Sequence, residues 1–134
     1  MNINMDELYQ AALKAADAAY VPYSHFRVGA ALLAENGTVF TACNVENRSY
    51  GLTICAERSA VVSAVSKGCR SFKAVAIATP DSVDPVGPCG ACRQVLSEFM
   101  AADAPVRFKA SGPRQVDTTI GELYPFDSLH ELKK

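Results

Sequence analysis

Apolar residues recur along the chain with two different spacings, and the alternation between them predicts a protein built from both helices and strands. The first helix is expected after Asn4, which with Glu7 three residues later fits a capping box, and it should end before Pro22. Its buried face consists of residues at helical spacing, namely Leu8, Ala12, Leu13 and Ala16.

Strand-like segments follow. Residues 26–33 are rich in apolar side chains, Asn36-Gly37 is a strong hairpin turn, and residues 38–45 would form the antiparallel partner strand. Residues 73–79 contain a continuous apolar run, which is typical of a strand covered on both faces. Later strands are expected over residues 106–110 and 116–120.

Two further helices separate these strands, one over residues 55–67 with Gly68 as its C-terminal cap and one over residues 89–101. A helix between two strands usually forms a right-handed parallel crossover. We therefore expect an α/β fold, a three-layer α/β/α sandwich around a mixed sheet of about five strands. The length of 134 residues suits a single domain over residues 1–134.

Composition narrows the partners and the cellular location. Hydrophobic residues make up 49% and charged residues 20%, and the formal net charge of −1 leaves no broad basic field for nucleic acid. No apolar run approaches membrane-spanning length, and the N-terminus does not resemble a secretory signal, so we expect no membrane partner and a cytoplasmic protein. Five cysteines, an odd number, argue against a closed disulfide framework.

Candidate chemistry is concentrated in Cys55-Ala56-Glu57 and Pro88-Cys89-Gly90-Ala91-Cys92, each at the start of a predicted helix. Cys89 and Cys92 share one helix face, whereas Cys55 and Glu57 can serve one site only if it lies off the end of their helix. The pattern thus predicts two helix N-termini directed at one zinc ion. Three thiolates leave one coordination position open for water, and a neighbouring carboxylate can move protons for that water.

Arg58 has a predicted role beside this site. Zinc with three thiolates carries a net negative charge and would acidify water poorly. We expect the two helix N-termini and Arg58, which can donate hydrogen bonds to ligand sulfurs, to keep the site electrophilic.

Non-catalytic readings of the same cysteines are a redox pair and a structural zinc site. A redox pair leaves Cys55 and Glu57 unexplained. A structural zinc normally takes a fourth cysteine or histidine. The only histidines are His25, directly before a predicted strand, and His130, in a charged C-terminal tail, so a structural zinc domain is the less favoured alternative.

Five sequence blocks resemble those of the small, homotetrameric cytidine deaminases, in the same order and at similar separations. They are residues 20–32 (YVPYSHFRVGAAL), 44–47 (NVEN), 50–52 (YGL), 55–58 (CAER) and 88–96 (PCGACRQVL). The last two also match the known zinc deaminase signature. The resemblance extends from about residue 8 to residue 125.

The resemblance implies hydrolytic deamination of cytidine and 2′-deoxycytidine to uridine and 2′-deoxyuridine, with release of ammonia, as in pyrimidine salvage. It implies one zinc ion per subunit, held by Cys55, Cys89 and Cys92, with Glu57 moving protons between water and the base. It also implies a homotetramer whose active sites are shared between subunits.

Substrate-binding residues are likewise implied by the resemblance. Asn44 and Glu46 would bind the ribose, Phe26 would stack on the base, and the backbone of Ala56 would lie near the substrate. Without the resemblance, Phe26 would be assigned to the core, and Asn44 and Glu46 could equally be turn residues.

Two residues would act across subunits. Tyr50 would reach a neighbouring active site. The family usually has a C-terminal Leu-Leu-Pro with a phenylalanine two residues further on, whereas here Leu123-Tyr124-Pro125 is followed at once by Phe126. Phe126 therefore corresponds to that phenylalanine less closely than the other site residues correspond to theirs.

Two other deaminase classes compete with this interpretation. Blasticidin S deaminases share the metal-binding blocks, although Asn44 and Glu46 favour a ribose-bearing substrate. Deaminases that edit polynucleotides usually have histidine as the first ligand and need a basic groove, which this chain does not indicate.

Overall fold

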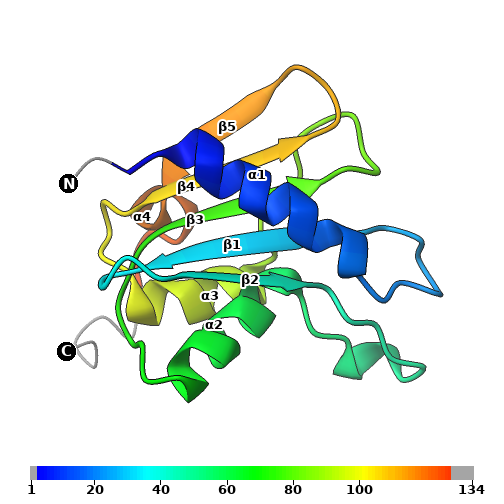
Figure 1. The fold of residues 1–134 in the computed structure, drawn as a ribbon, viewed down its shortest axis with the longest axis horizontal. Helices are drawn as coiled ribbons and strands as arrows, with labels where there is room; N and C mark the ends of the chain where they lie inside the picture. The colour runs from blue at the N-terminus through cyan, green and yellow to red at the C-terminus, as the bar shows by residue number, and fades with distance from the viewer. Residues whose placement is uncertain (1–2, 128–134) are drawn as a thin grey trace.

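One mixed sheet with the strand order β2-β1-β3-β4-β5 forms the centre of the molecule, and helices cover both of its faces (Figure 1). This computed structural model describes residues 3–127. The strands are β1 (Gly29–Ala34), β2 (Val39–Cys43), β3 (Phe72–Thr79), β4 (Pro105–Ala110) and β5 (Gln115–Thr119). The helices are α1 (Met5–Ala15), α2 (Ala56–Ser66), α3 (Gly90–Phe99) and α4 (Ile120–Leu123), with short 3-10 turns η1 (Ala16–Ala18) and η2 (Tyr50–Leu52).

Strand pairing confirms the mixed sheet predicted from the order of elements. β1 pairs antiparallel with both β2 and β3, while β3 and β4, joined through α3, run parallel. The β1–β2 hairpin turns at Asn36-Gly37 as expected: Gly37 has a φ of 91°, and the Asn36 side chain accepts a hydrogen bond from the Thr38 N–H over 3.0 Å.

Helix α1 lies close to one face of the sheet. Asn4 caps it by accepting a hydrogen bond from the Glu7 N–H over 3.1 Å. The sheet presents mainly alanines to this helix, and Leu8, Tyr9 and Ala12 pack against them. At the start of β1 the backbones approach so closely that a Cβ on Gly29 would lie 1.9 Å from the Ala12 carbonyl oxygen.

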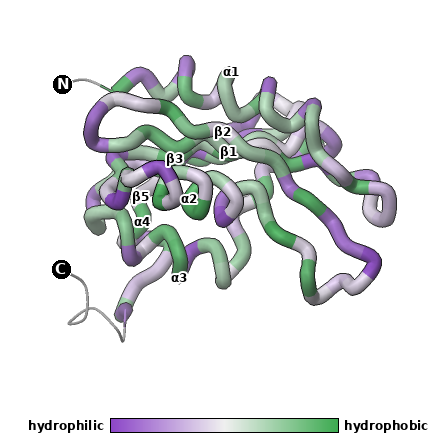
Figure 2. Tube along the Cα trace, turned by 60° about the horizontal axis from the view of Figure 1, so that its bottom comes forward, coloured by the Kyte–Doolittle hydropathy of each residue, from purple (hydrophilic) through white to green (hydrophobic). Residues whose placement is uncertain are grey.

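The larger core lies on the opposite face, beneath α2 and α3. Figure 2 shows α1 on one side of the sheet and α2 and α3 on the other. Leu32, Phe72, Ile77 and Leu96 are among the largest fully buried side chains of this core. Within residues 3–127, no helix has the length and apolarity needed to cross a bilayer.

Several element boundaries differ from the sequence prediction, and one short helix was not predicted. β1 begins at Gly29 and not at residue 26, because the N–H groups of residues 26–28 donate to side chains and not to a neighbouring strand. β2 ends at Cys43, and Val45 makes only single bridges to other segments. The short helix α4 was not predicted; Thr119 caps it by accepting from the Glu122 N–H over 3.2 Å.

Candidate active site

Helices α2 and α3 begin beside one another, and their first residues bring three cysteines together. Cys55 is the N-cap residue of α2, Cys89 is the N-cap of α3, and Cys92 lies in the first turn of α3. The Sγ atoms of Cys55 and Cys89 are 3.8 Å apart, and those of Cys89 and Cys92 are 3.5 Å apart. The thiols thus meet where two helices begin, as the sequence predicted.

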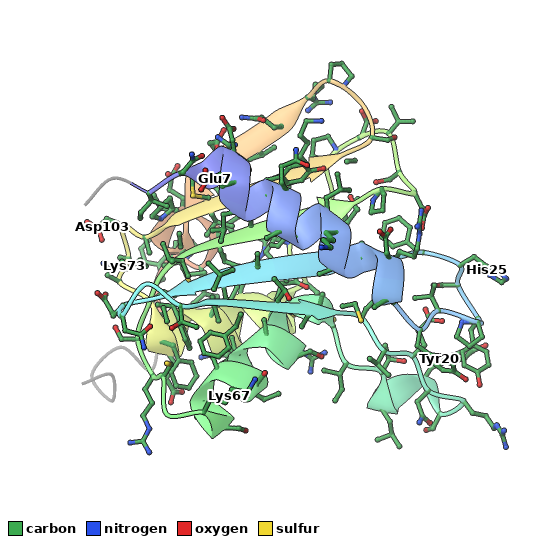
Figure 3. All side chains as sticks on the ribbon, viewed as in Figure 1. Glu7, Tyr20, His25, Lys67, Lys73 and Asp103 are labelled. Atoms are coloured by element: carbon green, nitrogen blue, oxygen red, sulfur yellow. The ribbon has the colours of Figure 1, made fainter. Side chains whose placement is uncertain are left out.

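The spacing of these sulfurs fits a tetrahedral zinc ion. Zinc–sulfur bonds of about 2.3 Å at tetrahedral angles place two ligand sulfurs about 3.8 Å apart. Among residues 3–127, Cys55, Cys89 and Cys92 are the one group of potential ligands close enough to hold an ion, with their sulfurs within 4.8 Å of one another. His25, labelled in Figure 3, is exposed before β1 and is not part of this group, and His130 lies outside the described residues. The donor set therefore provides three thiolates and leaves one position open.

Glu57 stands next to this cluster and is buried, with only 4% of its surface exposed. It lines a cavity of about 170 Å³ together with Cys55 and Cys89. Burial raises the pKa of Glu57 to about 7, and the charge of Cys55 acts in the same direction. A carboxyl group with a pKa near neutrality can both accept and release a proton under physiological conditions.

Arg58 contacts one of the three thiols. Its Nη2 donates to the Sγ of Cys55 over 3.4 Å. Hydrogen bonds, first from Cys92 and then from Arg58, lower the pKa of Cys55 to about 5 despite its partial burial. The guanidinium Nε is buried and has no hydrogen-bond partner among the described residues. Arg58 thus contacts a predicted ligand, as expected of a charge-compensating residue.

Asn44 forms part of the cavity wall. Its side chain is almost fully buried, accepts from the Val28 N–H and donates to the Phe26 carbonyl, both over 2.9 Å. Both halves of the amide are therefore engaged with the backbone that leads into β1.

Other predicted substrate contacts lie outside this cavity. Phe26 is half-buried and contributes its carbonyl to Asn44 without lining the cavity. Glu46 accepts hydrogen bonds from the N–H groups of Tyr23 and Ser24, over 3.1 Å and 3.2 Å, and from the Ser24 hydroxyl. The Ser24 bonds, led by the hydroxyl, lower the pKa of Glu46. Ala56 is buried at the first position of α2, beside the cavity-lining Cys55 and Glu57.

The two residues expected to act across subunits are strongly exposed. Tyr50 is 74% exposed and makes an edge contact with Tyr23, at 5.7 Å between ring centroids. Phe126 is fully exposed and has a φ of 55°, a conformation that bulky residues rarely adopt. Within one chain, neither reaches the thiol cluster.

Several cavity residues were not identified from the sequence. They line the same cavity as Asn44, and they are Val28, Thr53, Ile77, Thr79, Val86 and Gly87. Thr79 could have been identified from the sequence. It is the last residue of β3, and ligands in α/β proteins bind at the carboxyl ends of strands.

Comparison with known proteins agrees with this geometry. Residues 3–107 match the family described as the cytidine and deoxycytidylate deaminase zinc-binding region, and the chain belongs to this family. It is 49% identical over 123 residues to a cytidine deaminase of Sporosarcina psychrophila, covering 92% of this chain and 90% of that protein. A crystal structure of cytidine deaminase from Burkholderia pseudomallei superposes with a TM-score of 0.87 at 43% identity, covering 92% of this chain and 98% of that one. The three-layer fold and the zinc-dependent class of enzyme are thereby confirmed.

A protein named for another substrate is also similar. The chain is 37% identical over 126 residues to a blasticidin-S deaminase of Bacillus cereus, covering 89% of this chain and 88% of that protein. This identity is lower than the 49% found for the cytidine deaminase of Sporosarcina psychrophila.

Proposed function

We infer that this chain is a zinc-dependent hydrolase that converts cytidine and 2′-deoxycytidine to uridine and 2′-deoxyuridine and releases ammonia. The observation that carries this conclusion is a cluster of three cysteine sulfurs, two of which line one cavity together with the buried Glu57. Membership of the deaminase family and the high identity to cytidine deaminases support the substrate.

In this proposal Cys55, Cys89 and Cys92 hold the zinc ion, since they satisfy the spacing of a tetrahedral site. Zinc supplies a Lewis acid that lowers the pKa of water at its open position. Glu57 would accept a proton from the attacking water and deliver it to the ring nitrogen N3. It would then accept the proton of the new hydroxyl on C4 and deliver it to the departing amine, which leaves as ammonia. Its burial suits this work, because a pKa near 7 makes both directions of transfer accessible.

Sugar and base recognition rests on residues around the cavity mouth. Asn44 lines the cavity. Glu46 accepts a hydrogen bond from the Ser24 hydroxyl, and a ribose hydroxyl could take the place of that donor. Phe26 would stack on the base, and the backbone of Ala56 would lie near the substrate. These four roles are proposals that rest on the family resemblance and on the position of each residue.

We also propose a homotetramer with active sites shared between subunits, acting in pyrimidine salvage in the cytoplasm. Support comes from large exposed apolar side chains, of which Tyr23 and Tyr50 contact one another, since exposed apolar surface marks association sites. These side chains include Tyr20, Tyr23, Tyr50, Leu52 and Ile54. Tyr50, and less closely Phe126, would complete a neighbouring active site. Residues 1–134 would form the single domain of each subunit, with residues 1–2 and 128–134 outside the described structure.

Ammonia release from cytidine by the purified protein, with and without a strong chelator, tests the proposed activity. We expect turnover that disappears on metal removal and returns with zinc. A parallel panel of deoxycytidine, cytosine and blasticidin S separates the nucleoside activity from its rival. Turnover of blasticidin S without turnover of cytidine would contradict the proposed substrate.

A further inference from the structure

The backbone of residues 26–28 lies outside the sheet, yet side chains from other elements hold it firmly. The Phe26 N–H donates to the Ser24 hydroxyl over 3.0 Å, and the Val28 N–H donates to Asn44 over 2.9 Å. Asn44 also binds the Phe26 carbonyl, as described above, and its own N–H donates to the Val28 carbonyl over 3.1 Å. Buried backbone groups need such partners, and here Asn44 supplies most of them from one side.

The remaining N–H of this segment is bound from the opposite side by Asp81. The Arg27 N–H donates to Asp81 Oδ2 over 2.8 Å. The Arg27 guanidinium contacts the same carboxylate with two donors, Nε to Oδ2 over 3.0 Å and Nη2 to Oδ1 over 2.7 Å. One carboxylate therefore fixes both the backbone and the side chain of Arg27, in the two-pronged geometry that makes arginine–carboxylate pairs strong.

This pair joins two walls of the active-site cavity. Val28 belongs to one wall, and Thr79 and Val86 belong to the segment that leaves β3 and carries Asp81. The antiparallel pairing of Gly29 with Ala78 sets the start of β1 beside the end of β3, at the same end of the sheet (Figure 1). Just beyond that pairing, the Arg27–Asp81 contact links the segment before β1 to the loop after β3.

We propose that Arg27 and Asp81 are a positioning pair that sets the separation of the two cavity walls before the substrate binds. This inference rests on the proposed deaminase function, because the held segment presents Phe26 and Val28 to the base. Neither residue lines the cavity, so the pair acts through residues 26–28 and through the loop after β3. When the cavity walls are already fixed, substrate binding costs less conformational entropy. Loss of the pair should therefore weaken substrate binding and raise KM.

Partial exposure does not reduce this pair to an ordinary surface ion pair. Its side chains are 39% and 26% exposed, and isolated exposed pairs contribute little to stability. Three hydrogen bonds to one carboxylate, one of them from the backbone, give the contact a defined geometry. The expected consequence of its loss is therefore a displaced wall and weaker substrate binding, with a modest change in stability.

The same loop offers a matched control. Asp84 lies three residues after Asp81 and pairs with Arg114 over 3.5 Å, with side chains 81% and 72% exposed. No contact of Asp84 with residues 26–28 is found among the described residues. Asp84→Asn removes one charge from the loop, as Asp81→Asn does, without touching the held segment.

Steady-state kinetics with cytidine test the pair through Asp81→Asn, Arg27→Gln, the double variant and Asp84→Asn. We expect each single variant at the pair to raise KM about tenfold with kcat changed less than about twofold, and the double variant to be no worse than either single one. Zinc content and the circular dichroism spectrum should equal those of the wild type, and Asp84→Asn should keep the wild-type KM. Arg27→Lys keeps the charge without the two-pronged contact, and its KM should lie between wild type and Arg27→Gln.

The possible failures are distinguishable. A wild-type protein that turns over no cytosine nucleoside refutes the proposed function itself. An active wild type whose KM is unchanged by Asp81→Asn and Arg27→Gln, or is raised equally by Asp84→Asn, overturns the positioning role alone. A loss confined to thermal stability, with KM unchanged, overturns it as well.

Discussion

The Nη2 atom of Arg58 lies 3.4 Å from the Sγ of Cys55, one helical turn earlier in the chain. A permanent positive charge thus touches one sulfur of a cluster that would otherwise give zinc a net negative charge. Such a contact draws electron density away from the metal, which keeps it able to polarise water.

Replacing Arg58 tests that electrostatic role. Arg58→Ala should lower zinc affinity or kcat by about 10- to 100-fold, the usual effect of losing a hydrogen-bond partner of a metal ligand. Zinc titration with a competing chelator and steady-state kinetics measure the two quantities. Arg70→Ala, at an exposed arginine, is the control. Full zinc retention with unchanged turnover in Arg58→Ala would remove Arg58 from the site chemistry.

Glu57 can be separated from metal binding by an isosteric change. Glu57→Gln keeps the size of the buried side chain but cannot accept a proton from water. We expect kcat to fall by at least about 10²- to 10⁴-fold, with zinc content and fold retained. The exposed Glu98 on α3 provides a control in Glu98→Gln. Substantial turnover by a zinc-loaded Glu57→Gln protein would assign proton transfer to another group.

Close packing between α1 and the sheet makes Gly29 sensitive to any side chain. A Cβ there would lie 1.9 Å from the Ala12 carbonyl oxygen and 2.6 Å from the Ala16 nitrogen, so the helix must move. Gly29→Ala should reduce the free energy of unfolding by about 3 kcal/mol or more.

Urea denaturation measures this effect. Gly51→Ala is the matched control, since a Cβ at Gly51 meets nothing within 4 Å. A loss below about 1 kcal/mol in Gly29→Ala would show that α1 shifts at little cost.

Acid stability should depend on Asp81. Hydrogen bonds from the Arg27 side chain and backbone lower the pKa of Asp81 to about 2 in the folded protein, against about 3.9 in an unfolded chain. Because the folded state binds the proton less readily, the stabilisation is complete above pH of about 4 and is lost as the pH falls towards 2.

Unfolding free energies between pH 5 and pH 2, both bounds approximate, measure this dependence. Asp81→Asn should flatten it, whereas Asp84→Asn should leave the wild-type slope largely intact. Equal slopes in wild type and Asp81→Asn would mean that the pair does not stabilise the folded state.

The fold was predictable wherever structure follows from local signals. Asn4 and Gly68 mark helix ends, Asn36-Gly37 marks the hairpin, and the apolar run over residues 73–79 marks the central strand. The thiol cluster was equally accessible, because the cysteine spacing requires two adjacent helix starts. Each of these signals is complete within a few residues of sequence.

Features that depend on distant partners were not predictable. Residues 26–28 have strand-like composition, but the N–H of Arg27 is bound by Asp81, which is 54 residues away. Helix α4 depends on packing against α3, as when the Arg93 guanidinium donates to the Leu123 carbonyl over 3.2 Å. No local pattern records such long-range contacts, although the Thr119–Glu122 cap of α4 is itself a local signal.

The most direct test is the metal content of freshly purified, active protein, measured by elemental analysis beside the rate of ammonia release from cytidine. We expect one zinc per chain in the wild type, and a loss of both zinc and activity in Cys89→Ser, with Cys43→Ser as the control outside the cluster. Full activity without a stoichiometric metal ion would contradict a mechanism built on Cys55, Cys89, Cys92 and Glu57.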